Sequence, residues 1–314
     1  MVKLINQNLK RDTLEMNKTD LYNRISDDLK KKLHLLVDKP EETIETTLKA
    51  LWFAAAGFPV SAKGARELSI PDLTEKQIKN LYQLIELRIN NTPLAYITNR
   101  QNFMGIEFLS DKRALIPRKE TELLGKKALE IANRITKSKG KINIIDVCCG
   151  SGNLGITIAY FNPECIVYLT DISHEAVGLT KDNINLFNLS QRVNAKQGDL
   201  FSAFETDEFY EKIDLIVCNP PYILSSKVRE MDIEISSNEP VLAFDGGMLG
   251  IKIIQRIVSE APKFLTHDGY LIFEVGVGQG NFIAQLCERT QLYKLIDSYS
   301  DDSGNIRVIL TQKL

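Results

Sequence analysis

The sequence has few of the residues that build metal sites and disulfide frameworks. Its 314 residues include only three histidines, His34, His174 and His267, and five cysteines without a Cys-x-x-Cys pair. Such scattered residues lack the spacing of a zinc site, and an odd number of cysteines favours reduced thiols over disulfides. We therefore expect neither a metal centre nor a disulfide scaffold.

Strong net charge and long apolar runs are also missing. The 39 Lys and Arg nearly balance the 41 Asp and Glu, so the formal charge is −2, and no strong overall field attracts the chain to nucleic acid or to a membrane. No apolar run approaches the roughly 20 residues that span a bilayer. The opening segment MVKLINQNLKRD has no apolar secretory core. These absences predict a cytoplasmic protein that binds neither membranes nor nucleic acid.

The composition is that of a folded chain with two domains, and the first part reads as helical. At 44% apolar and 25% charged residues, it is ordinary for a globular protein, and its length suggests two domains. Thr74 and Gln77 form the sequence pattern of a helix capping box. Residues 1–39 carry nine Lys and Arg against six Asp and Glu. This excess is typical of a solvated helical face, and a contact with RNA or the ribosome is the alternative.

From residue 91 onward the pattern changes twice. Residues 91–120 contain Pro and Gly together with the β-type runs FMGIEFL and RALIP, which predict a hairpin linker. Beyond residue 121, strand-like runs alternate with helical stretches. The strand-like runs are 141–147, 165–171, 212–218 and 270–275, and the helical stretches are 174–187 and 248–261. This alternation predicts an α/β fold, a doubly wound parallel sheet with helices on both faces, whose ligands bind at the carboxyl ends of the strands.

A glycine-rich turn, CCGSGNLG, follows the strand 141–147. Its Gly150-x-Gly152-x-x-Gly155 spacing matches the dinucleotide fingerprint and would serve NAD or S-adenosylmethionine equally. Asp171 ends the next strand, where a carboxylate either accepts both hydroxyls of a ribose or caps the following helix. Asp146 stands just before the turn, where it would repel a pyrophosphate but suits the cationic end of S-adenosylmethionine.

A second turn, Asn219-Pro220-Pro221-Tyr222, follows the strand 212–218. The two prolines stiffen it and remove two backbone donors, so its carbonyls have no competing N–H groups. A planar –NH2 group could donate one hydrogen to the Asn219 side chain and one to the Pro220 carbonyl, with Tyr222 against its plane. These bonds would orient a poorly nucleophilic nitrogen for attack on a methyl sulfonium.

These two turns together resemble the S-adenosylmethionine-dependent methyltransferases that act on planar amino groups. Over about residues 93–312 the chain is most similar to one group of them, the HemK/PrmC family of peptide-chain release factor glutamine methyltransferases. Further segments that match this family are Pro93–Ile97, Phe103–Gly105, Leu115–Glu122, Asn238–Pro240, 246–250, Phe273–Gly276 and Asp302–Val308.

The resemblance implies a fold and a division of the chain. It implies a Rossmann-like class I methyltransferase domain with a seven-stranded, mostly parallel sheet over residues 121–314. Residues 1–92 would form an all-helical substrate-recognition domain, and residues 93–120 a β-hairpin linker. The cofactor would be S-adenosylmethionine and the partners peptide chain release factors, methylated on the glutamine of their Gly-Gly-Gln motif by a monomeric enzyme.

The resemblance also implies roles for individual residues. The methionine part of the cofactor would be held by the glycine-rich turn and the ribose by Asp171, and Asp199-Leu200 would flank the adenine. The residues of that turn are Asp146, Cys148, Cys149, Gly150, Ser151 and Gly152. Asn219 would bind both cofactor and glutamine, Pro220, Pro221 and Tyr222 would line the glutamine slot, and the region of Pro117 would cover the cofactor.

The chain departs from the family pattern at a few positions, and other readings stay open. Cys148 replaces a usual glycine, Lys119 a usual proline, and Ser237-Asn238 the Arg-Phe of an Arg-Phe-Glu-Pro segment. The adjacent Cys148 and Cys149 leave two possibilities open: they alter the affinity for the cofactor, or they form a redox-sensitive pair. The alternatives in function are a ribosomal-protein glutamine methyltransferase, an adenine amino-methyltransferase of DNA or RNA, an NAD-dependent oxidoreductase and a catalytically silent binding protein. The balanced charge and the lack of a basic, aromatic-rich domain disfavour the adenine enzyme.

Overall fold

Helices build the first part of the chain, and a sheet between helices builds the second. The computed structural model describes residues 17–228 and 230–314, which fall into two units that divide between Asn102 and Phe103. The first sixteen residues of the basic stretch 1–39 lie outside the described residues. Among the described residues, no helix combines the length and apolar character needed to cross a membrane.

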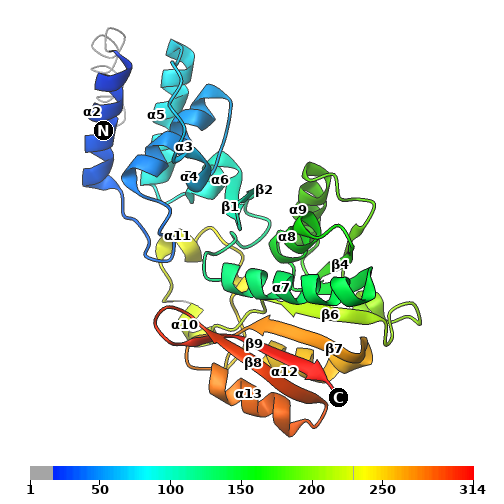
Figure 1. Ribbon diagram of the computed structural model, residues 1–314. Helices are drawn as coiled ribbons and strands as arrows, with labels where there is room; N and C mark the ends of the chain where they lie inside the picture. Colours follow the sequence, from blue (N-terminus) through cyan, green and yellow to red (C-terminus); the bar gives the residue numbers. More distant parts are fainter. Residues whose placement is uncertain (1–16, 229) are drawn as a thin grey trace. The chain divides into compact units, whose positions relative to one another are not determined.

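The first unit is a small helical bundle (Figure 1). Its described helices are α2 (Lys18–Lys32), α3 (Ile44–Ala56), α4 (Ala62–Ala65), α5 (Glu75–Ile89) and α6 (Leu94–Thr98). The predicted capping box is confirmed, because Thr74 accepts from the backbone N–H of Gln77 while the Gln77 side chain accepts from that of Thr74. The bundle packs around Trp52, whose indole N–H donates to the Pro71 carbonyl at 2.8 Å. Arg88 and Glu42 form a buried ion pair at 2.9 Å.

The segment expected to be a hairpin linker is partly a hairpin. It begins with the short helix α6, and the strands β1 (Arg100–Phe103) and β2 (Ile106–Leu109) then form a two-stranded sheet. Met104 and Gly105 turn between them with φ of 50° and 91°, as a tight hairpin requires. The run RALIP, read as β-type in the sequence, is not a strand. All its residues except Ile116 instead line the cavity described below, and Pro117 has no N–H to pair.

The second unit contains the expected seven-stranded, mostly parallel sheet, in the order β5-β4-β3-β6-β7-β9-β8 among the described residues. Its strands are β3 (Ile142–Val147), β4 (Cys165–Asp171), β5 (Val193–Gln197), β6 (Ile213–Cys218), β7 (Leu265–Glu274), β8 (Tyr293–Ser300) and β9 (Ile306–Lys313). Neighbouring strands from β5 to β7 run parallel, whereas β9 is antiparallel to both β7 and β8. The predicted fold class is therefore confirmed.

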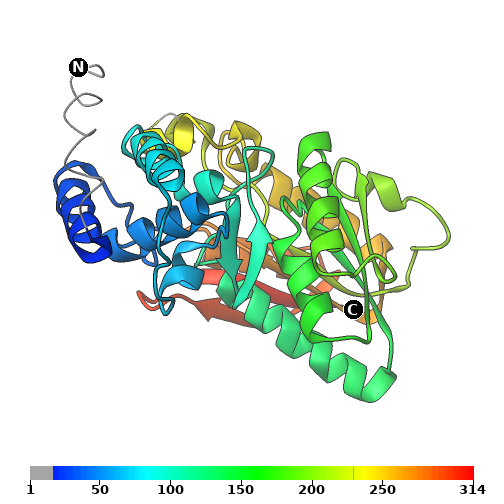
Figure 2. The same cartoon turned by 90° about the horizontal axis from the view of Figure 1, so that it is seen from above.

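Helices cover both faces of this sheet (Figures 1 and 2). The longer helices of the unit are α7 (Glu122–Lys139), α8 (Asn153–Phe161), α9 (His174–Leu186), α12 (Lys252–Glu260) and α13 (Gly280–Arg289), and the short ones are α10 (Ser225–Val228) and α11 (Ile233–Ser236). Successive strand residues alternate between the faces. Ile144 and Leu215 pack against α7, α8 and α9, whereas Ile145 and Ile216 pack against α12 and α13.

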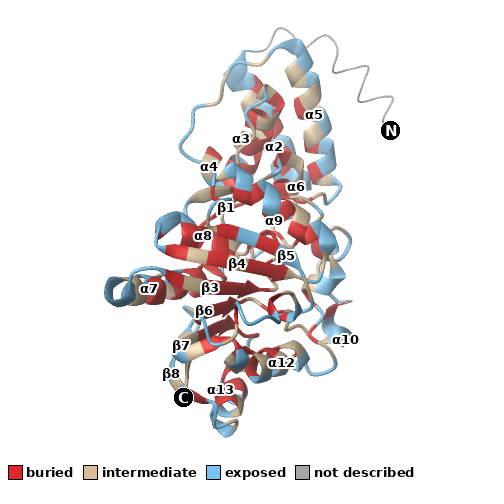
Figure 3. Cartoon of the chain, turned by 90° about the vertical axis from the view of Figure 1, so that its right-hand side faces the viewer, coloured by how far each residue is buried: buried red, intermediate tan, exposed pale blue. Residues whose placement is uncertain are grey.

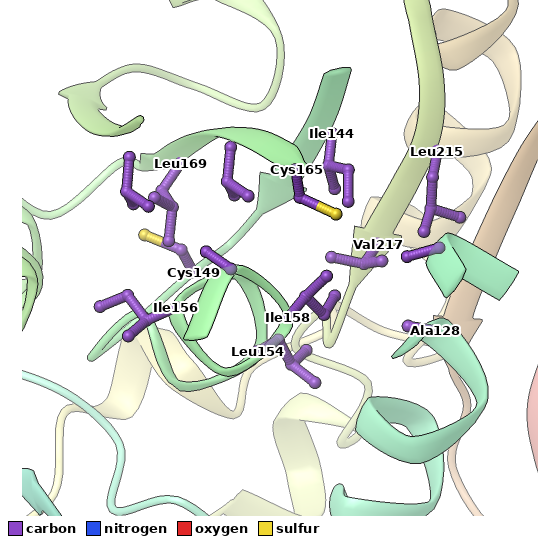
Figure 4. Close-up of a cluster of buried hydrophobic side chains, with 14 of the residues drawn as sticks. Ala128, Ile144, Cys149, Leu154, Ile156, Ile158, Cys165, Leu169, Leu215 and Val217 are labelled. Atoms are coloured by element: carbon purple, nitrogen blue, oxygen red, sulfur yellow. The ribbon is translucent and has the colours of Figure 1, made fainter. Parts of the chain in front are cut away.

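Burial on both faces explains why the central strands are continuous apolar runs. Figure 3 shows β3, β4 and β6 mostly buried, and none of their residues is exposed. Figure 4 shows the core on the α8 side, where Leu154, Ile156 and Ile158 face side chains of β3, β4 and β6. The register pairs Val147 with both Thr170 and Cys218, so β3, β4 and β6 end at the same level. The turns that follow these strands therefore meet at one edge of the sheet.

Candidate active site

A cavity of about 190 Å³ lies within the second unit, at the carboxyl ends of β3, β4 and β6. The turns after these strands form its floor, and the segments around residues 113–121 and 240–245 complete its wall. Its lining includes Arg113, Ala114, Leu115, Pro117, Arg118, Thr121, Cys148, Cys149, Gly150, Asn153, Leu154, Asp171, Ile172, Ser173, Ala176, Gly198, Asp199, Leu200, Asn219, Pro221, Pro240, Leu242, Ala243, Asp245 and Ile253. Of the predicted site residues, Asp146, Ser151, Gly152, Pro220 and Tyr222 do not line it.

The glycine-rich turn is held from behind by β4 and α9. The N–H of Cys149 donates to the Thr170 carbonyl at 3.0 Å, and the Thr180 hydroxyl donates to the Gly150 carbonyl at 2.7 Å. Gly152 has φ of 81°, and a Cβ there would lie 2.7 Å from the Ile156 side chain. A larger residue would therefore push the turn away from α8, which begins at the next position.

Asp171 joins the glycine-rich turn to the start of α9. Its Oδ2 accepts from the N–H of Gly150 and its Oδ1 from the N–H of Ser173, both at 2.9 Å. Burial raises the pKa of Asp171, and these two N–H groups oppose that rise. Ser173, not Asp171, caps α9, because its hydroxyl accepts from the N–H of Ala176. A carboxylate offers about four lone-pair sites, so the group can accept further hydrogen bonds at the cavity, which it lines.

Asp146 is fully buried beneath the same turn. Its Oδ2 accepts from the N–H of Gly155 at 2.8 Å, and its Oδ1 has no hydrogen-bond partner among the described residues. Burial raises its pKa to about 7. A Cβ on Gly155 would lie 3.0 Å from Oδ2, so glycine is needed for α8 to approach this carboxylate. Asp146 thus supports the turn from below and does not face the cavity wall.

The two adjacent cysteines differ in their surroundings. Cys148 lines the cavity in a left-handed backbone conformation, with φ of 57°. Side chains are strained there and glycine is not, which gives a physical reason for the glycine usual at this position in the family resembled. The Cys149 side chain is buried, 3.6 Å from the Thr180 hydroxyl, and burial raises the pKa of its thiol.

The Asn-Pro-Pro-Tyr turn has unused acceptors. Asn219 donates from Nδ2 to the Thr121 hydroxyl oxygen at 3.1 Å. The Oδ1 of Asn219 and the carbonyl of Pro220 accept no hydrogen bond from any residue that the structure describes. The Tyr222 hydroxyl donates to Glu274 Oε1 at 2.8 Å, which fixes the ring. The turn therefore offers two acceptors for an –NH2 group, one of them on a residue that lines the cavity.

Two glycines let the segment 246–250 lie against the backbone of this turn. A Cβ on Gly250 would lie 2.4 Å from the Tyr222 carbonyl oxygen, and one on Gly246 would lie 2.8 Å from the Pro221 carbonyl oxygen. Gln279 bridges the same two elements, since its Nε2 donates to the carbonyls of Tyr222 and Gly250 at 3.1 and 3.3 Å. The matched glycine segment thus braces the turn.

Asp199 and Leu200, which follow β5, also line the cavity. The Asp199 carboxylate is exposed and accepts from Arg256 Nη1 at 2.9 and 3.0 Å. Leu200 has φ of 51° and directs its buried side chain into the core on the α12 side. The cavity thus has a glycine face, a carboxylate with spare acceptors at Asp171 and a second one at Asp199, a set that fits an adenosyl group with two ribose hydroxyls.

Sequence reasoning missed the partners of the predicted residues. Thr121, Glu274, Gln279 and Arg307 contact the Asn-Pro-Pro-Tyr turn. For Thr121, Glu274 and Arg307 the only signal was their presence in matched segments, and no signal in the sequence pointed to Gln279. Within residues 17–228 and 230–314, no group of three or more His, Cys, Asp and Glu is arranged to hold a metal ion.

Comparison with known proteins identifies the family. The family model of the methyltransferase small domain matches residues 129–236. A release factor glutamine methyltransferase of Clostridium botulinum is 36% identical over 250 residues, which are 78% of this chain and 85% of that protein. The chain belongs to the release factor glutamine methyltransferase family.

Two other relatives extend the comparison. The release factor glutamine methyltransferase of Clostridium acetobutylicum is 32% identical over 239 residues, 76% of this chain and 81% of that protein. The ribosomal protein uL3 glutamine methyltransferase of Bradyrhizobium diazoefficiens is 35% identical over 212 residues, 66% of this chain and 65% of that protein. This chain is thus a protein glutamine methyltransferase that uses S-adenosylmethionine. The alternative of an NAD-dependent oxidoreductase is excluded.

Proposed function

We propose that this methyltransferase modifies the side-chain amide nitrogen of the glutamine in the Gly-Gly-Gln motif of peptide chain release factors. The observation that carries the proposal is the pair of unused acceptors, Asn219 Oδ1 and the Pro220 carbonyl, in a turn whose Asn219 and Pro221 line the cavity. A carboxamide has two N–H hydrogens in one plane and so matches two such acceptors. The names of the relatives, release factor glutamine methyltransferases in two Clostridium species, agree with this substrate.

The proposed roles follow from the chemistry of the amide. When bound, S-adenosylmethionine supplies an electrophilic methyl group on a sulfonium. The amide lone pair is delocalised, so the nitrogen attacks poorly unless it is oriented and polarised. Asn219 and Pro220 would hold the two N–H hydrogens, and Pro221 and Tyr222 would limit movement of the amide plane. Orientation and preorganised electrostatics of this kind contribute several kcal/mol each in favourable cases.

The remaining predicted residues are assigned to the cofactor. Asp171 would accept the ribose hydroxyls, Asp199 and Leu200 would flank the adenine, and Asp146 would fix the turn through Gly155. The backbone at Cys148, Cys149, Gly150, Ser151 and Gly152 would surround the methionine part. The test is a calorimetric titration with S-adenosylhomocysteine. We expect a binding heat, and we expect adenosine at high concentration to abolish that heat by competing for the same site.

The experiment that tests the substrate is transfer of a labelled methyl group. Release factors and variants with the Gly-Gly-Gln glutamine replaced by asparagine are incubated with enzyme and labelled S-adenosylmethionine. We expect label in the unchanged factor and none in the variant. Label that reaches ribosomal protein or DNA but no release factor would reject the proposal.

A ribosomal-protein glutamine is the second candidate. The uL3 glutamine methyltransferase among the relatives favours it, although this chain spans 65% of that protein. The same labelling assay with purified uL3 separates the two. The two acceptors would also fit the amino group of adenine, but the net charge of −2 gives the chain no overall attraction to nucleic acid, and the relatives compared above are named for glutamine.

We also propose that residues 1–92 recognise the protein substrate, that 93–120 link the domains and that 121–314 carry out the transfer. Lys31 and Lys32 are exposed at the end of α2, in the basic stretch. Replacing both by glutamate should raise KM for a release factor and leave kcat unchanged, and an unchanged KM would count against a role for this face.

We further propose that the enzyme is a monomer and that it works in the cytoplasm. A dimer mass measured by light scattering would contradict the monomer.

A further inference from the structure

Helix α9 carries a fully buried asparagine, Asn183, whose side chain binds two segments that build the cavity. Its Oδ1 accepts from the backbone N–H of Leu109 at 2.8 Å. Its Nδ2 donates to the Leu109 carbonyl at 3.2 Å and to the Ser151 carbonyl at 3.0 Å. Leu109 is the last residue of β2, just before the wall segment, and Ser151 belongs to the glycine-rich turn of the floor. One side chain thus joins wall and floor, although Asn183 itself does not line the cavity.

The backbone partners settle the direction of these three bonds. A backbone N–H can only donate and a carbonyl can only accept, so the Asn183 amide fits in one orientation. Both of its N–H hydrogens and its oxygen are then satisfied inside the protein, as burial requires. Asparagine is a poor residue for the interior of a helix. Its place in α9 is therefore explained by the two segments that it binds.

Other residues of α9 hold the wall segment that follows Leu109. Arg113, which lines the cavity, forms an ion pair with Asp182 at 2.8 Å. Ala114, also in the lining, forms a buried apolar cluster with Ala176 and Leu179. The wall segment is therefore seated on α9 from its first residues.

The same helix holds the glycine-rich turn. The Thr180 hydroxyl donates to the Gly150 carbonyl at 2.7 Å, and Asn183 holds the next carbonyl, that of Ser151. Thr180 and Asn183 are three residues apart, so they share one face of α9. Two successive peptide groups of the turn are thus fixed by one helix face, and Asn183 alone of this pair also binds the end of β2.

We propose that Asn183 is a positioning residue that sets the separation between floor and wall, so that the cofactor meets both as it enters. The inference rests on the proposed placement of S-adenosylmethionine in this cavity. Without the carboxamide, the two segments lose their shared hydrogen-bond partner, and the cofactor has to order them itself. Order that is completed only on binding lowers the affinity.

Asn183→Leu and Asn183→Asp test this role by calorimetric titration with S-adenosylhomocysteine. Leucine has nearly the shape of asparagine without its hydrogen bonds, and aspartate keeps the shape and the acceptor but loses both donors. We expect the affinity to fall about 10-fold in Asn183→Leu, the scale of one or two neutral hydrogen bonds. Asn183→Asp should lose at least as much, because its carboxylate would face the carbonyls of Leu109 and Ser151. Wild-type affinity in either variant overturns the proposal.

The matched control is Asn162→Leu. Asn162 is also a buried asparagine that makes three side-chain hydrogen bonds, with Asn133, Thr136 and the N–H of Glu164, and it does not line the cavity. We expect both leucine variants to lower the thermal unfolding midpoint, and Asn162→Leu to keep wild-type affinity for S-adenosylhomocysteine. An equal loss of affinity in the two variants would reflect lower stability alone and would overturn the proposal.

Steady-state kinetics separates positioning from a loss of folded enzyme. With a release factor as substrate, Asn183→Leu should raise KM for S-adenosylmethionine about 10-fold and change kcat far less. A lower kcat with an unchanged KM is the mark of a smaller folded fraction and would overturn the proposal.

A last readout uses the wild type, so it does not depend on the folding of any variant. In ¹⁵N-labelled protein, the side-chain –NH2 signal of Asn183 is identified by its proximity to the Leu109 N–H. We expect S-adenosylhomocysteine to shift this signal and to leave that of Asn162 in place, and an unmoved Asn183 signal overturns the proposal. If the wild type transfers no methyl group to release factors while the binding results hold, the proposed substrate fails and the role of Asn183 stands.

Discussion

Arg118 and Glu239 form a buried ion pair between two segments that both line the cavity. The Glu239 side chain is 0% exposed and that of Arg118 13% exposed, and Glu239 also accepts from the N–H of Ile116 at 3.0 Å. The contact joins the segment before α7 to the segment that precedes Pro240. Because Pro117 and Pro240 line the cavity from these two segments, the pair holds that part of the wall together.

Glu239→Ala should loosen this wall. Removing one partner of a buried pair leaves a buried charge poorly compensated, so we expect the free energy of unfolding to fall by about 3 kcal/mol. The affinity for S-adenosylhomocysteine, measured by calorimetry, should fall as well. Glu205→Ala is the control, since its pair with Lys263 is exposed and worth at most about 1 kcal/mol. Equal effects of the two substitutions would show that Glu239 has no special role.

Asn219→Ala should abolish methyl transfer and leave the fold intact. The side chain is half-buried at the end of β6, and its bond to Thr121 ties the turn without contributing to the apolar core. The checks are single-turnover transfer from labelled S-adenosylmethionine and the circular dichroism melting curve. Turnover at the wild-type rate would refute the assigned role.

Asp171→Ala should weaken cofactor binding by about 10- to 100-fold, because hydrogen bonds to a charged acceptor contribute about 1.5–3 kcal/mol each. The loss of the bonds to Gly150 and Ser173 adds to this by freeing the glycine-rich turn. Calorimetric titration with S-adenosylhomocysteine measures the change. Asp207→Ala, which alters an exposed acid outside the cavity, should bind as the wild type does, and equal affinities in all three proteins would contradict the prediction.

Asp146 makes stability depend on pH. Its pKa is about 7 in the folded chain and about 3.9 when unfolded. Between these values the folded chain holds a proton that the unfolded chain has released, so stability falls as pH rises through this window, by at most about 1.4 kcal/mol per pH unit. Asp146→Asn should remove this contribution. Urea unfolding across the window measures the free energy of unfolding of both proteins. That of the wild type should fall relative to that of Asp146→Asn as pH rises. A constant difference between the two across the window would exclude the effect.

Thr157→Val should stabilise the protein. The Thr157 hydroxyl is buried without a hydrogen-bond partner among the described residues, and valine has nearly the same shape without the desolvation cost. We expect the free energy of unfolding to rise by about 1 kcal/mol. Denaturant unfolding measures it, with the exposed Thr206→Val as the control. A destabilised Thr157→Val would mean that the hydroxyl has a partner after all.

The central strands could be predicted from sequence because burial on both faces makes them continuous apolar runs. The run 165–171 has the bounds of β4. The edge strands β5 and β8 escaped, since their sequences VNAKQ and YKLIDSYS are largely polar and only their neighbours make them strands. Strand β9 was not predicted either, although it is internal to the sheet and its centre is buried. Strand β7 begins at Leu265, earlier than the run 270–275, because Asp268 and Gly269 interrupt its apolar pattern.

The site was predictable where it depends on topology. Asp171 and Asn219 each follow a parallel strand, and parallel strands bring such positions to one edge. The contacts of Thr121 with Asn219, and of Glu274 and Arg307 with Tyr222, were not predictable. They join the turn to the residue before α7, the last residue of β7 and the start of β9, which are far apart in the sequence. The left-handed backbone at Cys148 was hidden for a different reason, since a non-glycine residue gives no local signal of positive φ.

Strand β9 lies between β7 and β8 and carries Arg307. During synthesis β8 leaves the ribosome first and has no partner in the sheet until β9 follows, so closure of this half of the sheet waits for residues 306–313. The carboxylate behind the Asn-Pro-Pro-Tyr turn receives its guanidinium at the same late moment. A nascent chain interrupted before Ile306 would expose an unpaired strand edge and lack the arginine that contacts Tyr222 in the Asn-Pro-Pro-Tyr turn, so we expect such fragments to be prone to aggregation.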